Sequence, residues 1–273
     1  MTVWDTLLVA ASGLAAGALN AVAGGGTLLA FPALLATGMA ARTANIVSTI
    51  GLVPGYLGGS VAYRRELSGQ GPRVRALAAT SVVGGIAGAV ILLAAPADSF
   101  RAVVPYLLLG ACALLAAQPR IGRWVAVREA GRAAERAEGR PGGAPVAGRG
   151  AGPRTEVSTG LRVAVFAAAV YGSYFGAGLG VLLLAVFGIL LVDGMQQLNA
   201  LKGLLSFLIN AVSVIVFAVG GDVDWWATAV LAVTAWVGAA AGVGVARRLS
   251  PSLLRSAVVA FGAAVAAVLL VRG

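Results

Sequence analysis

The polar residues whose types and spacing could do chemistry lie on one face of an apolar segment. Asn199, Lys202, Ser206 and Asn210 follow one another at spacings of three and four residues, so they share a helix face. Lys202 is the only lysine, and an ammonium group turned toward the inside of a membrane bundle can neutralise an anionic solute. Alternatively, Lys202 lies at the membrane edge and extends into the lipid headgroups. We predict that this face contributes to binding an anion.

The first half of the chain carries a neutral counterpart of this polar face. Asn45, Ser48 and Thr49 lie within one and a half helical turns and offer hydrogen-bond donors and acceptors to the same solute. Asn20 either joins them or forms a hydrogen bond between helices. Arg42 is expected either to attract anions at the outer mouth or to anchor in the headgroups. Asp193 is expected to cap the following helix rather than to couple protons.

Two glycine clusters interrupt long uncharged runs, one in each half of the chain. They are Gly24, Gly25 and Gly26 within 6–41, and Gly176, Gly178 and Gly180 within 163–192. A single helix over 6–41 would exceed the roughly 30 Å apolar core of a bilayer. Backbone that leaves helical geometry inside a membrane must be buried in protein or line a cavity. We therefore predict broken helices whose exposed N–H groups suit an anion and whose glycines line its path.

The chain is poor in groups that could catalyse a reaction. It has no histidine, the commonest general base and metal ligand. Its carboxylates fall in predicted loops or at membrane edges, and the single cysteine, Cys112, is expected to fill space within a span. We expect no enzyme activity, no metal and no cofactor.

Composition and charge place these residues in a membrane. The chain is 59% hydrophobic and 11% charged, and uncharged runs at 43–63, 76–97, 102–119, 203–221, 225–246 and 256–271 fit membrane crossings. Most arginines fall around 64–75, 120–162 and 247–255. The positive-inside rule assigns these loops to the cytoplasm, so the net charge of +10 indicates orientation in a bilayer and no nucleic acid. Both termini are then predicted outside.

We predict an all-α polytopic membrane protein built from two inverted-topology repeats, residues 1–118 and 161–273. Each repeat would contain a broken or re-entrant helix pair plus three transmembrane helices, giving roughly eight to ten membrane segments in all. The stretch 119–160 is a basic cytoplasmic linker, with a charged surface helix over 122–138 and a flexible second part. Small residues at helical spacing are expected to let helices pack closely; they are Gly84, Gly88, Gly238 and Gly242.

Several stretches resemble the TauE/SafE family of bacterial sulfite exporters. They are AVAGGGTLLAFPALLATGM at 21–39, TANIVSTIGLVPG at 43–55 with AYRREL at 62–67, and LNALKGLLSFLIN at 198–210 ahead of GDVDW at 221–225. The resemblance spans both halves and leaves out the basic linker. It implies movement of sulfur-containing or other organic anions, often outward, across the bacterial cytoplasmic membrane, without an ATPase subunit. Residues 47–49 depart from the Thr-Asn-Thr pattern expected of the family.

We therefore expect a secondary transporter, working as an exporter of small sulfur-containing or other organic anions by alternating access. Two alternatives stay open: an anion channel that uses the same path, and a membrane scaffold that docks a partner through the basic linker. The expected partners are a small anionic solute and membrane lipid, and a homodimer is compatible with the sequence.

Overall fold

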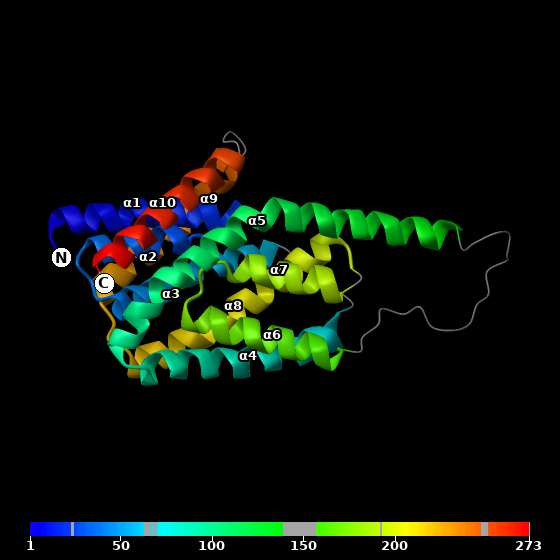
Figure 1. Ribbon diagram of the computed structural model, residues 1–273, viewed down its shortest axis with the longest axis horizontal. Helices are drawn as coiled ribbons and strands as arrows, with labels where there is room; N and C mark the ends of the chain where they lie inside the picture. The colour runs from blue at the N-terminus through cyan, green and yellow to red at the C-terminus, as the bar shows by residue number, and fades with distance from the viewer. Residues whose placement is uncertain are drawn as a thin grey trace.

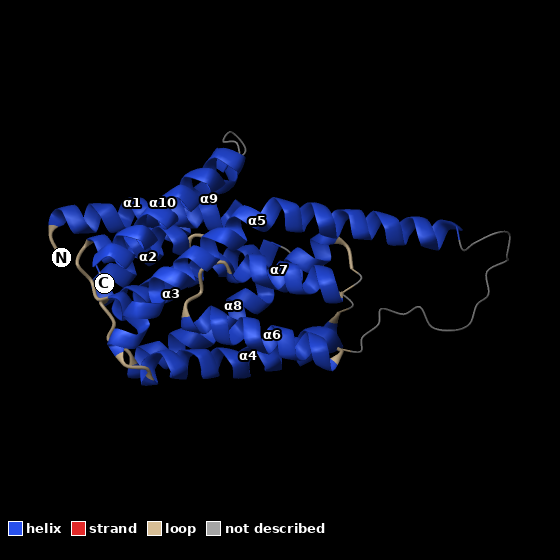
Figure 2. Cartoon of the chain, in the orientation of Figure 1, coloured by secondary structure: helices blue, strands red, loops and turns tan. Residues whose placement is uncertain are grey.

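The computed structural model describes residues 1–22, 25–62, 67, 70–138, 157–191, 193–246 and 251–272, and these fold into helices joined by loops (Figures 1 and 2). The first half contains α1 (Val3–Val22), α2 (Thr27–Ala36), α3 (Ala41–Ala62), α4 (Gly71–Ala94) and α5 (Ala97–Glu138). The second half contains α6 (Thr159–Tyr174), α7 (Leu179–Leu190), α8 (Met195–Gly220), α9 (Trp225–Ala246) and α10 (Pro251–Arg272). The described residues contain no strand, and the all-α prediction is confirmed.

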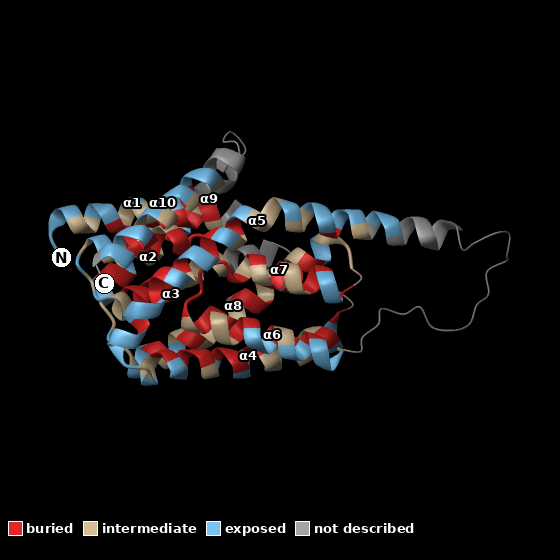
Figure 3. Cartoon of the chain, viewed as in Figure 1, coloured by how far each residue is buried: buried red, intermediate tan, exposed pale blue. Residues whose placement is uncertain are grey.

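The helices have the lengths and surfaces of a membrane protein. Four stretches are long and apolar enough to cross a bilayer: Val3–Asn20, Gly71–Ala94, Ala97–Arg128 and Met195–Gly220. Shorter apolar helices cover Thr27–Ala36, Leu179–Leu190, Trp225–Ala240 and Arg255–Val271. Large apolar side chains such as Ile215, Val233 and Trp236 remain exposed, and exposed residues lie on the outward helix faces (Figure 3). Because lipid is the natural environment of such a surface, these features indicate a multi-pass membrane protein.

Both predicted helix interruptions are present. α1 ends at Val22 and α2 begins at Thr27, while α6 ends at Tyr174 and α7 begins at Leu179. α2 has 10 residues and α7 has 12, so neither crosses a bilayer alone. α1 packs on α2 and α6 packs on α7, and in Figure 1 each short helix turns back toward the end of the molecule where its partner began. Each pair is therefore a helical hairpin with its interruption at the tip.

A side chain from α1 satisfies the backbone of the first interruption. The Oδ1 atom of Asn20 accepts hydrogen bonds from the N–H groups of Gly25 and Gly26, at 3.1 and 2.9 Å. A Cβ atom at Gly26 would collide with the carbonyl oxygen of Ala16, so only glycine fits this close approach to α1. The polar backbone of the interruption is thus paired inside the protein, as a lipid surrounding requires.

The second interruption is held by groups from two helices. The hydroxyl of Tyr171 donates to the carbonyl oxygen of Ala177 at 2.6 Å, and Asn45 Nδ2 of α3 donates to the carbonyl oxygen of Tyr174 at 2.9 Å. Gly176 and Gly178 both have φ of +78°, in the left-handed region that favours glycine. This interruption therefore depends on its glycines for its turn and on α3 for its pairing.

Equivalent helices of the two halves make equivalent contacts across the molecule. α1 packs on α9 as α6 packs on α4, α3 packs on α9 as α8 packs on α4, and α2 packs on α10 as α7 packs on α5. Two further contacts, α3 with α8 and α5 with α10, join equivalent helices directly. Figure 1 places both termini at one end of the molecule and the start of α6 at the other, so α1 and α6 run in opposite directions.

Glycines allow the closest of these helix contacts. A Cβ atom at Gly17 or Gly238 would collide with backbone across the α1–α9 contact, and one at Gly88 would collide with a carbonyl oxygen of α6. Gly84 would meet α6 in the same way. The predicted packing role of Gly84, Gly88 and Gly238 is therefore confirmed, whereas the surroundings of Gly242 lie outside the described residues.

Helix α5 continues beyond its membrane-crossing part. It has 42 residues and passes Pro119 without a break, so the first part of the predicted linker is helical and continuous with the span, and it projects from the body in Figure 1. The guanidinium of Arg128 lies 4.5 Å from the ring centroid of Trp124 and donates to the carbonyl oxygens of Gly188 and Ile189 at 3.4 and 3.5 Å. This contact ties the extension to the end of α7, where a cation suits the helix dipole. Residues 139–156 lie outside the described part.

The α1–α9 contact predicts a strong effect of size at Gly238. We expect Gly238→Leu to lower the free energy of unfolding by about 1–3 kcal/mol, because the added side chain must displace the backbone of α1. Gly110→Leu is the matched control, since a Cβ atom at Gly110 of α5 meets nothing within 4 Å. Thermal unfolding of the purified variants in detergent measures the effect, and equal midpoints for the two variants would contradict this packing.

The first interruption predicts an effect of Asn20→Leu on stability. The substitution removes the acceptor of two backbone donors, and each buried donor left unpaired costs about 1–3 kcal/mol. Asn210→Leu is the control, because Asn210 Nδ2 donates to the carbonyl oxygen of Ser206 within its own helix and leaves no backbone N–H unpaired. Asn20→Leu should therefore lower the unfolding temperature more than Asn210→Leu. The reverse order would show that Asn20 does not hold the interruption.

Candidate functional site

Lys202 of α8 lies against the first turn of α7. Its Nζ atom donates to Asn199 Oδ1 at 3.1 Å. A Cβ atom at Gly180 would lie 3.7 Å from Lys202 Cδ and 3.9 Å from Cε, so the aliphatic stem of the lysine packs over the beginning of α7. The structure thus brings together three residues that the sequence predicted for the site: Gly180, Asn199 and Lys202. The N-terminal end of α7 adds its own positive partial charge beside the ammonium.

The ammonium of Lys202 has no carboxylate partner within the described part of the chain. The single ion pair found there joins Arg73 to Asp193. Lys202 is partly buried, and an ammonium withdrawn from water without a counter-charge is costly. An anion bound beside Lys202 would therefore be stabilised.

The rest of the predicted polar face on α8 turns into the protein. Ser206, Asn210 and Ser213 are buried, and the Ser213 hydroxyl lies 2.6 Å from that of Ser173 on α6. Asn210 donates to the backbone of its own helix. The Oγ atom of Ser206, one turn along the helix from Lys202, is buried and has no hydrogen-bond partner among the described residues. A buried hydroxyl without a partner needs an explanation, and a bound solute is one.

The neutral counterpart on α3 reaches the second interruption through Asn45 alone. Asn45, Ser48 and Thr49 are buried. Ser48 Oγ and Thr49 Oγ1 donate to the backbone oxygen of Asn45, at 3.0 and 2.9 Å, while Asn45 Nδ2 bonds the carbonyl oxygen of Tyr174. Asn45 Oδ1 is buried, and no described residue forms a hydrogen bond with it. Asn45 therefore holds the backbone next to the glycine turn through its Nδ2 atom, and its Oδ1 atom can accept a further hydrogen bond from a solute.

The two interruptions contact the same turn of α5. A Cβ atom at Gly25 would lie 3.5 Å from a Leu115 methyl group, and one at Gly178 would lie 3.5 Å from a Leu114 methyl group. The hairpins also touch through aromatic rings, because Phe31 of α2 and Phe175 meet edge to face with centroids 5.4 Å apart. The structure thus brings both interruptions to the middle of the bundle.

The backbone groups of the predicted glycines are engaged in different ways. Gly25 and Gly26 already donate their N–H groups to Asn20, and Gly24 lies outside the described residues. Gly176 accepts from Leu179 and Gly178 accepts from Val181 and Leu182, so these two form the turn that starts α7. Gly180 is the one that lies beside Lys202.

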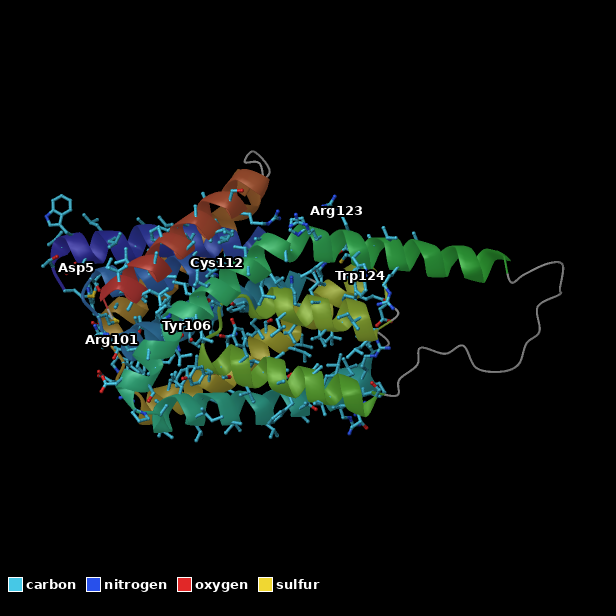
Figure 4. The ribbon with its side chains drawn as sticks, in the orientation of Figure 1. Asp5, Arg101, Tyr106, Cys112, Arg123 and Trp124 are labelled. Atoms are coloured by element: carbon cyan, nitrogen blue, oxygen red, sulfur yellow. The ribbon has the colours of Figure 1, made fainter. Side chains whose placement is uncertain are left out.

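Cys112 fills space, as expected. It is a free, buried cysteine on α5 in the central part of the molecule in Figure 4, whereas Asp5 and Arg101 lie at the end that holds the termini. A Cβ atom at Gly262 of α10 would lie 2.6 Å from Cys112 Sγ. Within the described ranges, no group of three or more His, Cys, Asp or Glu residues is placed to hold a metal ion.

Two charged residues at helix ends have partners within the protein. Arg42 Nη1 donates to the carbonyl oxygen of Ala95 at 3.3 Å. Asp193 forms the ion pair with Arg73, and Gly194 is the N-cap residue of α8. The expectation that Asp193 caps α8 is therefore wrong, because the guanidinium of a buried arginine is a stronger partner for its carboxylate than backbone N–H groups.

The aromatic residues around the second interruption were not among the predicted site residues. Tyr171, Tyr174 and Phe175 directly precede the glycine turn and supply its hydroxyl bond and two ring contacts. Their signal was three aromatic side chains within five positions, directly before the glycine cluster. Arg73 was counted only as a loop charge, because nothing local to it points to Asp193.

Comparison with known proteins agrees with this architecture. The family described as "Sulfite exporter TauE/SafE" matches residues 9–269. The "Probable membrane transporter protein YfcA" of Escherichia coli, in strain K12 and likewise in the O6:H1 and O157:H7 strains, is 25% identical over 256 residues, which cover 93% of this chain and 86% of the relative. No solved structure matches the chain. With its apolar helices and a family match over nearly its whole length, the chain belongs to the TauE/SafE family of membrane transporters.

Proposed function

We propose that this transporter carries a small sulfur oxyanion, sulfite or an organic sulfonate, and that the anion binds beside Lys202 at the second helix interruption. The observation that carries the proposal is the ammonium of Lys202, which lies against the first turn of α7 with no carboxylate partner among the described residues. A cation and a helix N-terminus at one place form a site for a negative charge. The family description supports a sulfur oxyanion as the solute and export as the direction.

Hydrogen-bond donors would complete the site. Asn199 holds the ammonium at 3.1 Å, and its amide N–H groups can reach the same solute. The unpaired hydroxyl of Ser206 would donate to one anion oxygen. The unused Oδ1 of Asn45 would accept from a bridging water or a protonated solute oxygen. Gly176, Gly178 and Gly180 shape the turn, whereas Gly25 and Gly26, engaged by Asn20, would bound the path from the other hairpin.

The transporter would work by alternating access between two inverted-topology repeats, α1–α5 and α6–α10. Two observations support this. Most helix contacts have a counterpart between the equivalent helices of the other half, as α1 on α9 and α6 on α4 illustrate. In addition, α1 and α6 run in opposite directions in Figure 1. A site at the junction of such repeats can open to either side when one repeat rocks against the other.

The orientation follows from charge. The start of α4 and the end of α7 lie toward the end where α6 begins, and both termini lie at the opposite end (Figure 1). Arg73 is in the first turn of α4 and Arg128 bonds the last turn of α7. By the positive-inside rule the arginine-rich end would face the cytoplasm and the termini would lie outside. The bacterial origin of the relatives supports the cytoplasmic membrane of a bacterium as the location.

The site predicts that ligand binding depends on Lys202. Wild-type protein should unfold at a higher temperature in the presence of sulfite or methanesulfonate, because a ligand at about a hundred times its Kd adds about 2.7 kcal/mol. Lys202→Ala should fold and lose this shift, while Arg75→Ala, which removes an exposed cation elsewhere, should keep it. An equal shift in the wild type and in Lys202→Ala would remove Lys202 from the site.

Flux measurements separate a transporter from an anion channel. In proteoliposomes, a transporter working by alternating access should show uptake of labelled sulfite that saturates with concentration and exchange of internal for external anion. Each turnover needs a conformational change on the microsecond-to-second scale. A flux that rises linearly with concentration and carries a steady current would support the channel instead.

A further inference from the structure

We propose that Lys202 also couples the anion to a proton, with the ammonium form binding the anion and the neutral amine returning the empty carrier. This proposal rests on the anion site described above and adds the coupling ion. Because anion and proton move in the same direction, export would be driven by a high internal concentration of the anion, and the proton would leave with it. It assigns to Lys202 a second role that a fixed positive charge could not fill.

The empty site leaves the charge of Lys202 without a counter-ion among the described residues. When the anion has left, Asn199 Oδ1 is the one hydrogen-bond partner of the Lys202 ammonium among the described residues, and no described carboxylate neutralises it. A charge withdrawn from water without a counter-charge is costly. Releasing the proton to water would remove the charge before the site reorients.

Position 202 carries a lysine and not an arginine. The chain has 20 lysine and arginine residues, of which a single one, Lys202, is lysine. Arginine stays protonated in proteins, whereas a buried lysine exchanges its proton readily. A site that needed only a permanent positive charge could use arginine, as every other cationic position of this chain does. The lysine therefore occurs at the proposed anion site, where proton release would let the empty site return without a charge.

The helices around α8 carry several other charged and titratable side chains. The helices packed against α8 are α3, α4, α6 and α7, and α7 contains no ionisable side chain. Their charged and titratable groups, with Asp193, are Arg42, Tyr56, Arg73, Arg75, Arg162, Tyr171 and Tyr174.

Each of these groups has another partner or lies at a helix end. Arg42 bonds Ala95, Arg73 pairs with Asp193 and Tyr171 bonds Ala177. Tyr174 contacts Phe100, and Tyr56 lies with Asn20 and Thr27. Arg75 and Arg162 are exposed. With no histidine in the chain, Lys202 is left as the proton carrier at this site.

The cycle balances in charge and atoms. On one side of the membrane the amine takes a proton from water, and the resulting ammonium binds a monoanion. The neutral pair then crosses as the site reorients. On the other side the anion leaves, the proton follows it into water, and the amine returns empty. One anion and one proton move together in each cycle, and no net charge crosses.

The test uses purified full-length protein in proteoliposomes that contain a pH-sensitive dye. Methanesulfonate is the probe, because it stays a monoanion and brings no proton of its own. An inward proton gradient should drive wild-type uptake of the probe together with acidification of the lumen. Lys202→Arg keeps the charge but cannot release a proton, so net uptake and acidification should fall about tenfold or more while exchange of labelled for unlabelled probe persists. Arg75→Lys is the matched control and should behave as wild type.

The outcomes separate this proposal from the anion site. Wild-type uptake without acidification, or proton-driven uptake by Lys202→Arg equal to wild type, would overturn the coupling and leave the site standing. Neither uptake nor exchange of methanesulfonate by wild type would overturn both. If Lys202→Arg does not fold, wild-type uptake under a potential imposed with valinomycin decides. Uptake that is independent of the potential is expected, and uptake driven by the potential contradicts an electroneutral cycle.

Discussion

The backbone hydrogen bond is the constraint on which the rest of the structure depends. Lipid offers no partner for an N–H or C=O group, so every residue that leaves helical geometry must be paired inside the protein. Here two hairpins break their helices within the bundle, and each break is paired differently. Asn20 closes the first from its own hairpin, whereas the second depends on Tyr171 and on Asn45 of the other half. That difference locates the candidate site, because the second break joins both halves.

Close packing and charge follow from the same constraint. Helices that pack closely in lipid approach through glycines, as α9 does on α1 and α4 on α6. The interior that results is apolar except for a few groups, and among these Lys202 stands out because its charge has no described counter-ion. The Arg73–Asp193 pair shows how the same fold treats a buried charge that is structural: it supplies a partner of opposite sign. A site for a transported anion leaves that partner to the solute.

Much of the architecture could be predicted from the sequence, because it depends on local properties. The glycine clusters within over-long uncharged runs predicted the positions of both breaks. The spacing of Asn199, Lys202, Ser206 and Asn210 predicted one helix face, which is partly buried at the first two residues and buried at the last two. What depends on packing between distant segments could not be predicted. Asp193 meets Arg73 across 120 positions, so its local setting suggested only a cap. The continuation of α5 through Pro119 reflects the Ala, Arg and Glu residues that follow, which favour a helix. The boundaries of the two repeats and the linker stay predictions.

The most direct test of the account is the position of a bound anion. Selenite is a close analogue of sulfite, and its selenium atom gives an anomalous X-ray signal that marks its place without reference to a model of the protein. In crystals of the full chain soaked in selenite, the account predicts a peak within about 4 Å of Lys202 Nζ, the distance of an ion pair. A peak found only at the ends of the bundle, near Arg42 or Arg101, with none beside Lys202, would contradict it.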